Sequence, residues 1–172
     1  MENKLAVVPR VVVSRMLGEK DYGVLLTDRR MIFVHERTSR LGIAAGLGGV
    51  VGGVIAERAA KRREFAYADG DPETLARIEG SIVIPGSAIR YVRVKPSMNV
   101  PYAYAMRVDY EGENGKMTKF SCMFLPPQSH AEKRAAEGIK HEEILKEYAL
   151  SAQEAFKSAL PPGIRDSSEW IR

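Results

Sequence analysis

The sequence predicts a mainly β protein of the α+β class, in which antiparallel strands are followed by an amphipathic C-terminal helix. Two β-rich runs, Tyr22–Thr27 and Arg30–Arg37, are separated by only two residues, which is typical of a hairpin. Apolar and polar residues alternate through residues 104–111 and again through 119–124, as in strands with one buried face. From residue 141 to 160 the apolar residues instead recur at helical spacing.

The composition fits one globular domain. The chain has 172 residues, of which 45% are hydrophobic and 28% charged, enough to bury a core and too apolar for disorder. Cys122 is the single cysteine, so no disulfide can form within the chain and a reducing, cytoplasmic compartment is expected. We assign one domain to residues 1–160 and a tail to residues 161–172.

The remaining strands follow from the same kind of pattern. The run Arg10–Leu17 is a strand candidate before the hairpin, whose tight connection is Asp28 and Arg29. Residues 81–96 supply one or two more strands, interrupted at Pro85 and Gly86 because proline has no N–H to donate to a neighbouring strand. The turn GENG then joins the last two strands, so their apolar faces can meet.

Two helices are predicted, one short and one long. The short one begins at Pro72 with Asp71 as its cap and stops at Gly80. The long one ends before the prolines at 161 and 162. The segment Ser129–Gly138 is either a further short helix or a charged loop. The apolar stripe of the long helix consists of Leu145, Tyr148, Ala152, Ala155, Phe156 and Ala159.

The segment LGIAAGLGGVVGGVIAE, residues 41–57, departs most from an ordinary soluble sequence. Its stretch without charge, 41–56, would be about 24 Å long as a helix, shorter than the roughly 30 Å of a bilayer core. Glycines spaced four apart permit close helix approach, yet each costs about 0.5–1 kcal/mol against alanine in a helix in water. We therefore predict a glycine-rich insertion, 41–64, ordered by its own domain, a second copy or lipid. The membrane or oligomer contact is assigned to Gly42, Gly46, Gly48, Gly49, Gly52 and Gly53.

Basic residues gather around this insertion. The chain carries a net charge of +4, and the surplus lies N-terminally, on both sides of the glycines. A basic cluster beside an apolar stretch favours an anionic surface such as lipid headgroups, although a solvated helix face has the same pattern. The lipid- or anion-binding candidates are Arg37, Arg40, Arg58, Lys61, Arg62 and Arg63.

One stretch carries a family resemblance. YGVLLTDRRMIFV resembles the glycine, apolar run, Thr-Asp-Arg-Arg, apolar run signature of bacterial and archaeal pleckstrin-homology-like (PH-like) and GRAM-type domains. IPGSAIRYVRV is similar to the isoleucine-proline strand entry of that family, and the resemblance extends over roughly residues 5–160. It implies two nearly orthogonal sheets that form a partly open barrel, with the last helix closing one end.

The resemblance also implies a range of ligands, because PH-like domains bind phosphoinositides, peptides or other proteins. The family's inositol-phosphate pattern places basic residues in the loop between the first two strands. Here that loop is predicted at Gly18–Asp21, which has one lysine and two acids, so an inositol-phosphate site is not expected there.

Enzyme and metal motifs do not fit. In the glycine segment Val54 stands where a P-loop needs lysine. HEEIL at residue 141 has Leu145 where a second zinc-binding histidine would lie. His35, His130 and Cys122 have no metal-ligand spacing, and no nucleophile has a base partner visible in the sequence, although catalytic triads assemble through space. We expect no enzyme, no cofactor and no metal.

Two macromolecular partners remain open, while nucleic acid is disfavoured. ERAAKRRE has four basic residues but also two glutamates and no aromatic residue for base stacking. The sequence therefore predicts a non-enzymatic PH-like module that touches the membrane periphery through its insertion. The alternative is a protein-interaction scaffold or homo-oligomer with the glycines at the subunit interface. Trp170 in the tail would cover its own domain or dock on a partner.

Overall fold

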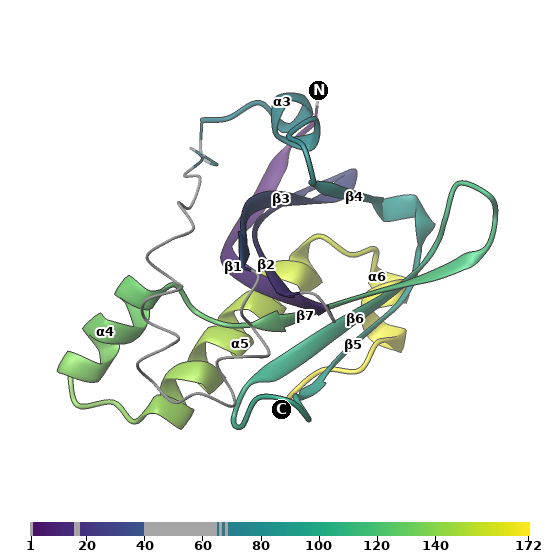
Figure 1. Cartoon of the computed structure of the whole chain (residues 1–172). Helices are drawn as coiled ribbons and strands as arrows, with labels where there is room; N and C mark the ends of the chain where they lie inside the picture. The colour runs from purple at the N-terminus through teal and green to yellow at the C-terminus, as the bar shows by residue number, and fades with distance from the viewer. Residues whose placement is uncertain (1, 16–17, 40–64, 66, 68) are drawn as a thin grey trace.

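The structure, a computed structural model of the whole chain, describes residues 2–15, 18–39, 65, 67 and 69–172 (Figure 1). In these residues the strands form one antiparallel, seven-stranded sheet in the order β4-β3-β2-β1-β7-β6-β5. The prediction of a mainly antiparallel β protein is therefore confirmed. The strands are β1 Lys4–Arg15, β2 Gly18–Thr27, β3 Arg30–Ser39, β4 Ile82–Pro85, β5 Ile89–Pro96, β6 Tyr104–Glu111 and β7 Met117–Phe124.

The predicted hairpin is formed by β2 and β3, but β2 begins earlier than expected. Gly18–Asp21, predicted as a loop, belongs to β2 and pairs with both neighbouring strands. The loop prediction, which followed the family pattern, was wrong because this stretch pairs with β1 and β3. Asp21 is in fact buried, and its charge is balanced by arginines on β1 and β3.

Strand β1 also begins earlier than the predicted Arg10–Leu17, because it continues through Pro9. The pairing of β1 with β2 is irregular between Val8 and Val11, and Pro9 lies within that irregularity. A residue that cannot donate a main-chain hydrogen bond is tolerated at such a place. Pro9 therefore lies at an irregularity within the strand and does not mark its beginning.

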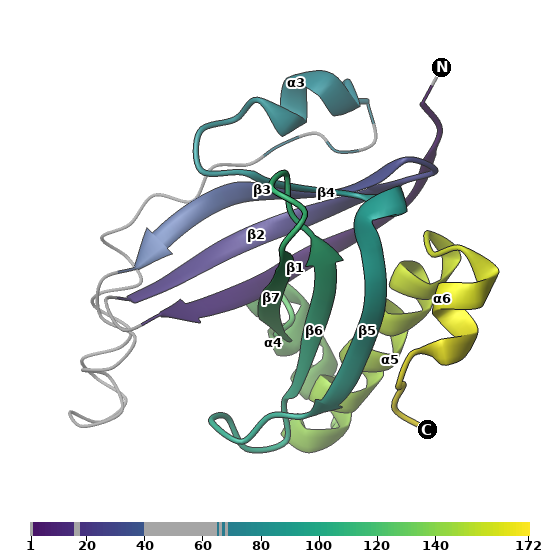
Figure 2. The same cartoon turned by 90° about the vertical axis from the view of Figure 1, so that its right-hand side faces the viewer.

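The two halves of the sheet meet at a narrow seam. Strands β1 and β7 pair only through Val11 with Phe124 and Val12 with Met123. In Figure 2 strands β1–β3 run steeply across the direction of β5–β7, and the seam lies where they meet. Beyond these two pairs β1 continues to Arg15 without β7 beside it, so the sheet opens there.

Helix α5, His141–Ser158, closes the core against both halves of the sheet. The Phe156 ring lies 6.2 Å from that of Phe33 on β3 and 5.9 Å from that of Phe124 on β7. The Tyr148 hydroxyl accepts a hydrogen bond from the Arg10 main-chain N–H and donates one to its carbonyl, at 2.9 and 2.7 Å. The predicted C-terminal helix is confirmed, and it ends two residues before the predicted Leu160.

In the described residues, three shorter α-helices and a 3-10 turn at Gly86–Ala88 accompany α5. Helix α3, Pro72–Ala76, has the predicted cap, since the Asp71 carboxylate accepts a hydrogen bond from the Thr74 N–H, and its Leu75 packs on the outer side of β2 and β3. Helix α4, Gln128–Ala136, covers most of the segment Ser129–Gly138, which is therefore a short helix and not a charged loop. Helix α6, Pro162–Ser167, was not predicted; the prolines that end α5 begin a new helix, because proline suits the first helical turn.

A buried ion cluster holds β1, β2 and β3 together on the side away from α5. The Asp21 side chain is 4% exposed and receives Arg37 at 2.8 Å and Arg10 at 3.2 Å. Arg10 also donates to the Pro126 carbonyl at 3.2 Å, which ties the chain after β7 to the same cluster. Removing one member of a buried ion pair costs far more than removing an exposed pair.

Replacing Phe156 with alanine should lower the free energy of unfolding by about 3–5 kcal/mol, because it opens a cavity where α5 meets both halves of the sheet. Urea unfolding followed by circular dichroism measures this. Ser151→Ala, on the exposed side of the same helix, should change stability by less than about 0.5 kcal/mol. A loss below about 1 kcal/mol for Phe156→Ala would contradict this packing.

Asp21→Asn should lower the free energy of unfolding by about 3 kcal/mol, because it removes the carboxylate that two guanidinium groups share. The matched control is Glu111→Gln, which breaks the exposed pair with Arg90 and should cost about 1 kcal/mol or less. Equal losses for the two variants in the same urea titration would show that Asp21 is not the neutralising group.

Candidate functional site

The connection between β5 and β6, which we call the β5–β6 tip (residues 97–103), exposes large apolar side chains. Met98 is 91% exposed and Tyr102 is 63% exposed, and Pro101 between them is exposed as well. Loops of soluble proteins are mostly polar, so an apolar tip of this kind indicates a contact surface. The tip is therefore the first candidate for function.

The β5–β6 tip is an ordered turn. The Ser97 hydroxyl accepts hydrogen bonds from the Asn99 and Val100 N–H groups, both at 3.2 Å, and the Ser97 N–H donates to the Ala103 carbonyl at 2.7 Å. Tyr102 has φ of 63°, a left-handed conformation that costs a bulky residue about 1–3 kcal/mol. The turn thus holds its exposed residues in place against local strain.

A hollow of about 320 Å³ lies beside the tip, where the sheet opens past the seam. Its walls come from the end of β1, from the tip itself and from the neighbouring part of β6 and β7. Ser14 and Ser121 both line the opening, and they lie two positions beyond Val12 and Met123, the last pair that joins β1 to β7. The lining residues are Val12, Ser14, Lys95, Pro96, Ser97, Met98, Asn99, Ala105, Ser121, Cys122 and Met123.

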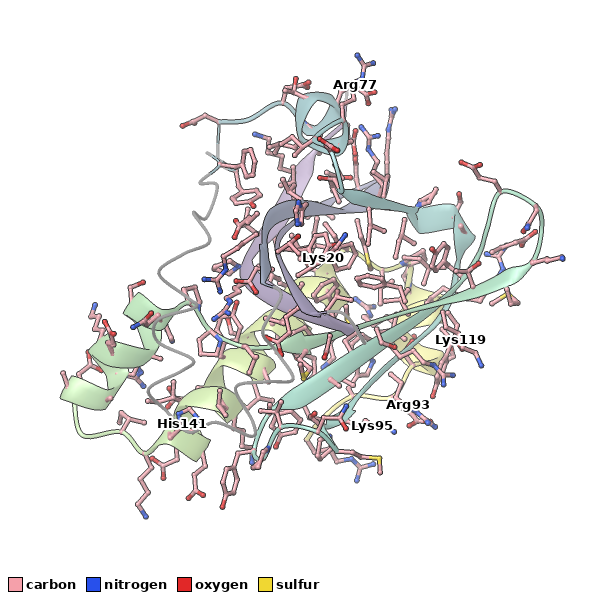
Figure 3. The ribbon with its side chains drawn as sticks, viewed as in Figure 1. Lys20, Arg77, Arg93, Lys95, Lys119 and His141 are labelled. Atoms are coloured by element: carbon pink, nitrogen blue, oxygen red, sulfur yellow. The ribbon has the colours of Figure 1, made fainter. Side chains whose placement is uncertain are left out.

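Basic side chains lie on the solvent face of β5–β7, and one of them, Lys95, lines the hollow. Arg93 on β5 pairs with Arg107 on β6. Lys95 lies two residues along β5 from Arg93, and Lys119 lies on β7 opposite Asp109, two residues along from the partner of Arg107 on that strand, so all four share one face (Figure 3). Arg93 binds Glu169 and Arg107 binds Asp109, at 2.7 and 2.8 Å. Lys95 and Lys119 form no ion pair or side-chain hydrogen bond with any residue that the structure describes, so this face carries a local positive excess.

Hydrogen bonding fixes the charge states of the paired groups. Hydrogen bonds to the Glu169 carboxylate, and to a lesser extent to the Tyr91 hydroxyl, raise the pKa of Arg93. Hydrogen bonds from Arg93, and to a lesser extent from Tyr91, hold the pKa of Glu169 below its usual range. Burial raises the pKa of Cys122 well above that of a free thiol, so this cysteine stays protonated and unreactive at neutral pH.

Of the residues predicted to bind anions, the structure describes only Arg37. Its guanidinium is 12% exposed and is held by Asp21, so it serves the ion cluster of the sheet. Arg40, Arg58, Lys61, Arg62 and Arg63 lie outside the described residues, as do Gly42, Gly46, Gly48, Gly49, Gly52 and Gly53. Their assignment stays a prediction.

Ser39, the last described residue before the insertion, lies on the side of the β5–β6 tip. Ser39 at the end of β3 pairs with Glu19, and Glu19 pairs with Ser14, which lines the hollow. Two strand spacings, about 10 Å, therefore separate Ser39 from the rim of the hollow. Figure 2 shows the β5–β6 connection and the end of β3 on the same side of the molecule.

Sequence reasoning missed Met98, Tyr102 and Lys95. The signal that could have found them is KPSMNVPYAY, a connection with Met, Val and Tyr between and beside two prolines where small polar residues are usual. An apolar residue in a short loop becomes informative only when its exposure is known.

The described part of the chain contains neither a metal-ligand cluster nor a helix suited to cross a membrane. No three His, Cys, Asp or Glu side chains lie close enough there to hold a metal ion. Among the helices of that part, none combines the length and the apolar character that crossing a bilayer requires.

Comparisons with known proteins assign no family. No family model matches the sequence, and no curated protein matches it. Among solved structures, the hSac2 domain from human phosphoinositide phosphatase Sac2 is similar at 10% identity, over 99% of this chain and 79% of that one, with a TM-score of 0.42. A score at this level assigns neither a fold family nor an activity.

Proposed function

We propose that this chain is a non-enzymatic PH-like binding module that contacts anionic membrane surfaces with the β5–β6 tip. The observation that carries the proposal is the exposure of Met98 and Tyr102 beside Lys95, which has no anionic partner among the described residues. Peripheral membrane binding needs two kinds of group: apolar side chains that enter the membrane–water interface, and neighbouring cations that contact the lipid headgroups.

The PH-like part of the proposal rests on the sequence signature and on the arrangement of elements. The signature YGVLLTDRRMIFV falls on β2, the hairpin turn and β3. The sheet has two antiparallel halves joined by a narrow seam, and α5 packs across both. This arrangement is expected of a partly open barrel with a helix at one end. This order of strands and helix supports the family resemblance without depending on any ligand.

The physical basis of membrane contact is a short apolar insertion combined with charge attraction. Full transfer of a methionine or aromatic side chain from water to an apolar medium is worth about 1.5–3 kcal/mol, and each nearby lysine adds about 1 kcal/mol on an anionic surface. Two apolar side chains and one lysine give reversible binding. Stable attachment needs a second contact, and the apolar, basic-flanked insertion that follows Ser39 is the candidate for it.

Vesicle flotation tests the proposal. The intact chain should float with vesicles that contain anionic lipid and stay in solution with purely zwitterionic ones. The double variant Met98→Ser with Tyr102→Ser should bind at least about tenfold more weakly, because it removes the groups that enter the interface. Lys95→Gln should weaken binding about fivefold, and the effect should shrink as salt is added.

The matched control is Met117→Ser, since Met117 is 55% exposed at the start of β7, away from the β5–β6 tip. It should leave flotation unchanged. The proposal fails if the intact chain does not float with anionic vesicles, or if Met117→Ser weakens binding as much as the tip variant. Deleting residues 41–56 measures the share of the insertion separately.

The alternative, a homo-oligomeric scaffold, places the glycines of the insertion between subunits. Light scattering of the intact chain and of the version lacking residues 41–56 distinguishes it, because an interface made by the insertion disappears with it. A concentration-independent monomer in both cases would remove this alternative.

A further inference from the structure

The tail of the chain pairs with the exposed edge of the sheet through one bridge residue, Glu169. Strand β5 pairs with β6 on one side only, and its other edge receives residues after α6. The Glu169 N–H donates to the Val92 carbonyl at 3.0 Å, and the Glu169 carbonyl accepts from the Val94 N–H at 2.8 Å. One residue bonded to positions on either side of Arg93 is the pattern of a parallel pair, so the edge binds main chain.

A second main-chain contact comes from α5. Gln153 is 1% exposed, and its side-chain amide accepts from the Ile171 N–H at 2.8 Å and donates to the Ile171 carbonyl at 3.0 Å. A glutamine buried on a helix is satisfied here by the two main-chain groups of one residue. The edge of β5 and Gln153 of α5 together form a site, which we call the groove between β5 and α5, and it holds residues 168–171 through main-chain groups that any extended peptide possesses.

Side chains add selectivity at each position of this segment. The Ser168 hydroxyl accepts from the Val92 N–H at 3.0 Å, and the Glu169 carboxylate binds Arg93 at 2.7 Å. The Trp170 ring lies 5.3 Å from the Lys157 ammonium, and Ile171 packs against the core. The groove therefore fits a hydroxyl, an acid, an aromatic and an aliphatic residue in that order.

We propose that the groove between β5 and α5 is a binding site for extended peptides of this acidic-aromatic-aliphatic type, and that residues 168–171 occupy it as a displaceable internal ligand. The partner is a protein segment that adds a parallel strand to β5, in a different place from the membrane contact at the β5–β6 tip. Edge-strand addition of this kind combines main-chain affinity with side-chain selection.

The internal segment is held in a way that permits exchange. Its side chains are half-buried or exposed, and the Glu169 side chain is 55% exposed. It is joined to α5 only through the six-residue helix α6. As a tethered ligand it competes at an effective concentration of about millimolar, so a partner peptide binds the intact chain more weakly than a chain without the segment.

The test uses a fluorescent peptide with the sequence of residues 164–172 and measures its anisotropy with two proteins. One is the chain truncated after Ser167, whose folding is checked by thermal unfolding. The other is the full chain with a protease site inserted after Pro161, cut before the measurement, so that the internal segment is present but no longer tethered. Both should bind the peptide saturably, at least about tenfold more tightly than the uncut chain.

Selectivity is tested by exchanging charges. Arg93→Glu should weaken binding of the peptide about tenfold or more, and a peptide carrying Glu169→Arg should recover binding to that variant. The control Arg134→Glu makes the same charge change on α4, away from the groove, and should leave peptide binding unchanged. Saturable binding to neither opened protein, or equal binding of a scrambled peptide, would overturn the proposal.

Discussion

The narrow seam between β1 and β7 is the constraint on which the rest of the structure depends. Only two residue pairs link β1 to β7 in strand pairing, so the halves can turn steeply across one another, and neither half closes the core by itself. Helix α5 supplies what the seam lacks, because Phe156 contacts a ring from each half and Tyr148 binds the main chain of β1. The helix and the seam are therefore one structural unit.

The same seam creates the surfaces that we consider functional. Because the sheet opens past Val12 and Met123, a hollow forms there, and the β5–β6 tip folds beside it. At the opposite edge of that half, β5 has no neighbouring strand, so its free main-chain groups receive the tail. One half of the sheet thus presents a basic face, an apolar tip and an edge that binds extended chain.

The sequence was sufficient for most elements and insufficient for their charges and contacts. Alternation over β6 and β7, the hairpin signal and the stripe of α5 each report a local period, which one sequence contains. The strand position of Gly18–Asp21 could not be read locally, because it depends on Arg10 and Arg37, which lie on other strands. The exposure of Met98 and the clamp of Gln153 on Ile171 are likewise properties of packing, so residue type alone did not reveal them.

The most direct measurement of the central claim is the depth of single sites on a membrane. An environment-sensitive fluorophore is attached to a cysteine at position 98 or, as the comparison, at position 117; Cys122 is buried and protonated and leaves the new thiol as the reactive one. On anionic vesicles the probe at 98 should shift to shorter wavelength and be quenched by lipid-borne quenchers, while the probe at 117 stays in water. A shift at 117 and none at 98 would contradict the account, as would no shift at either site.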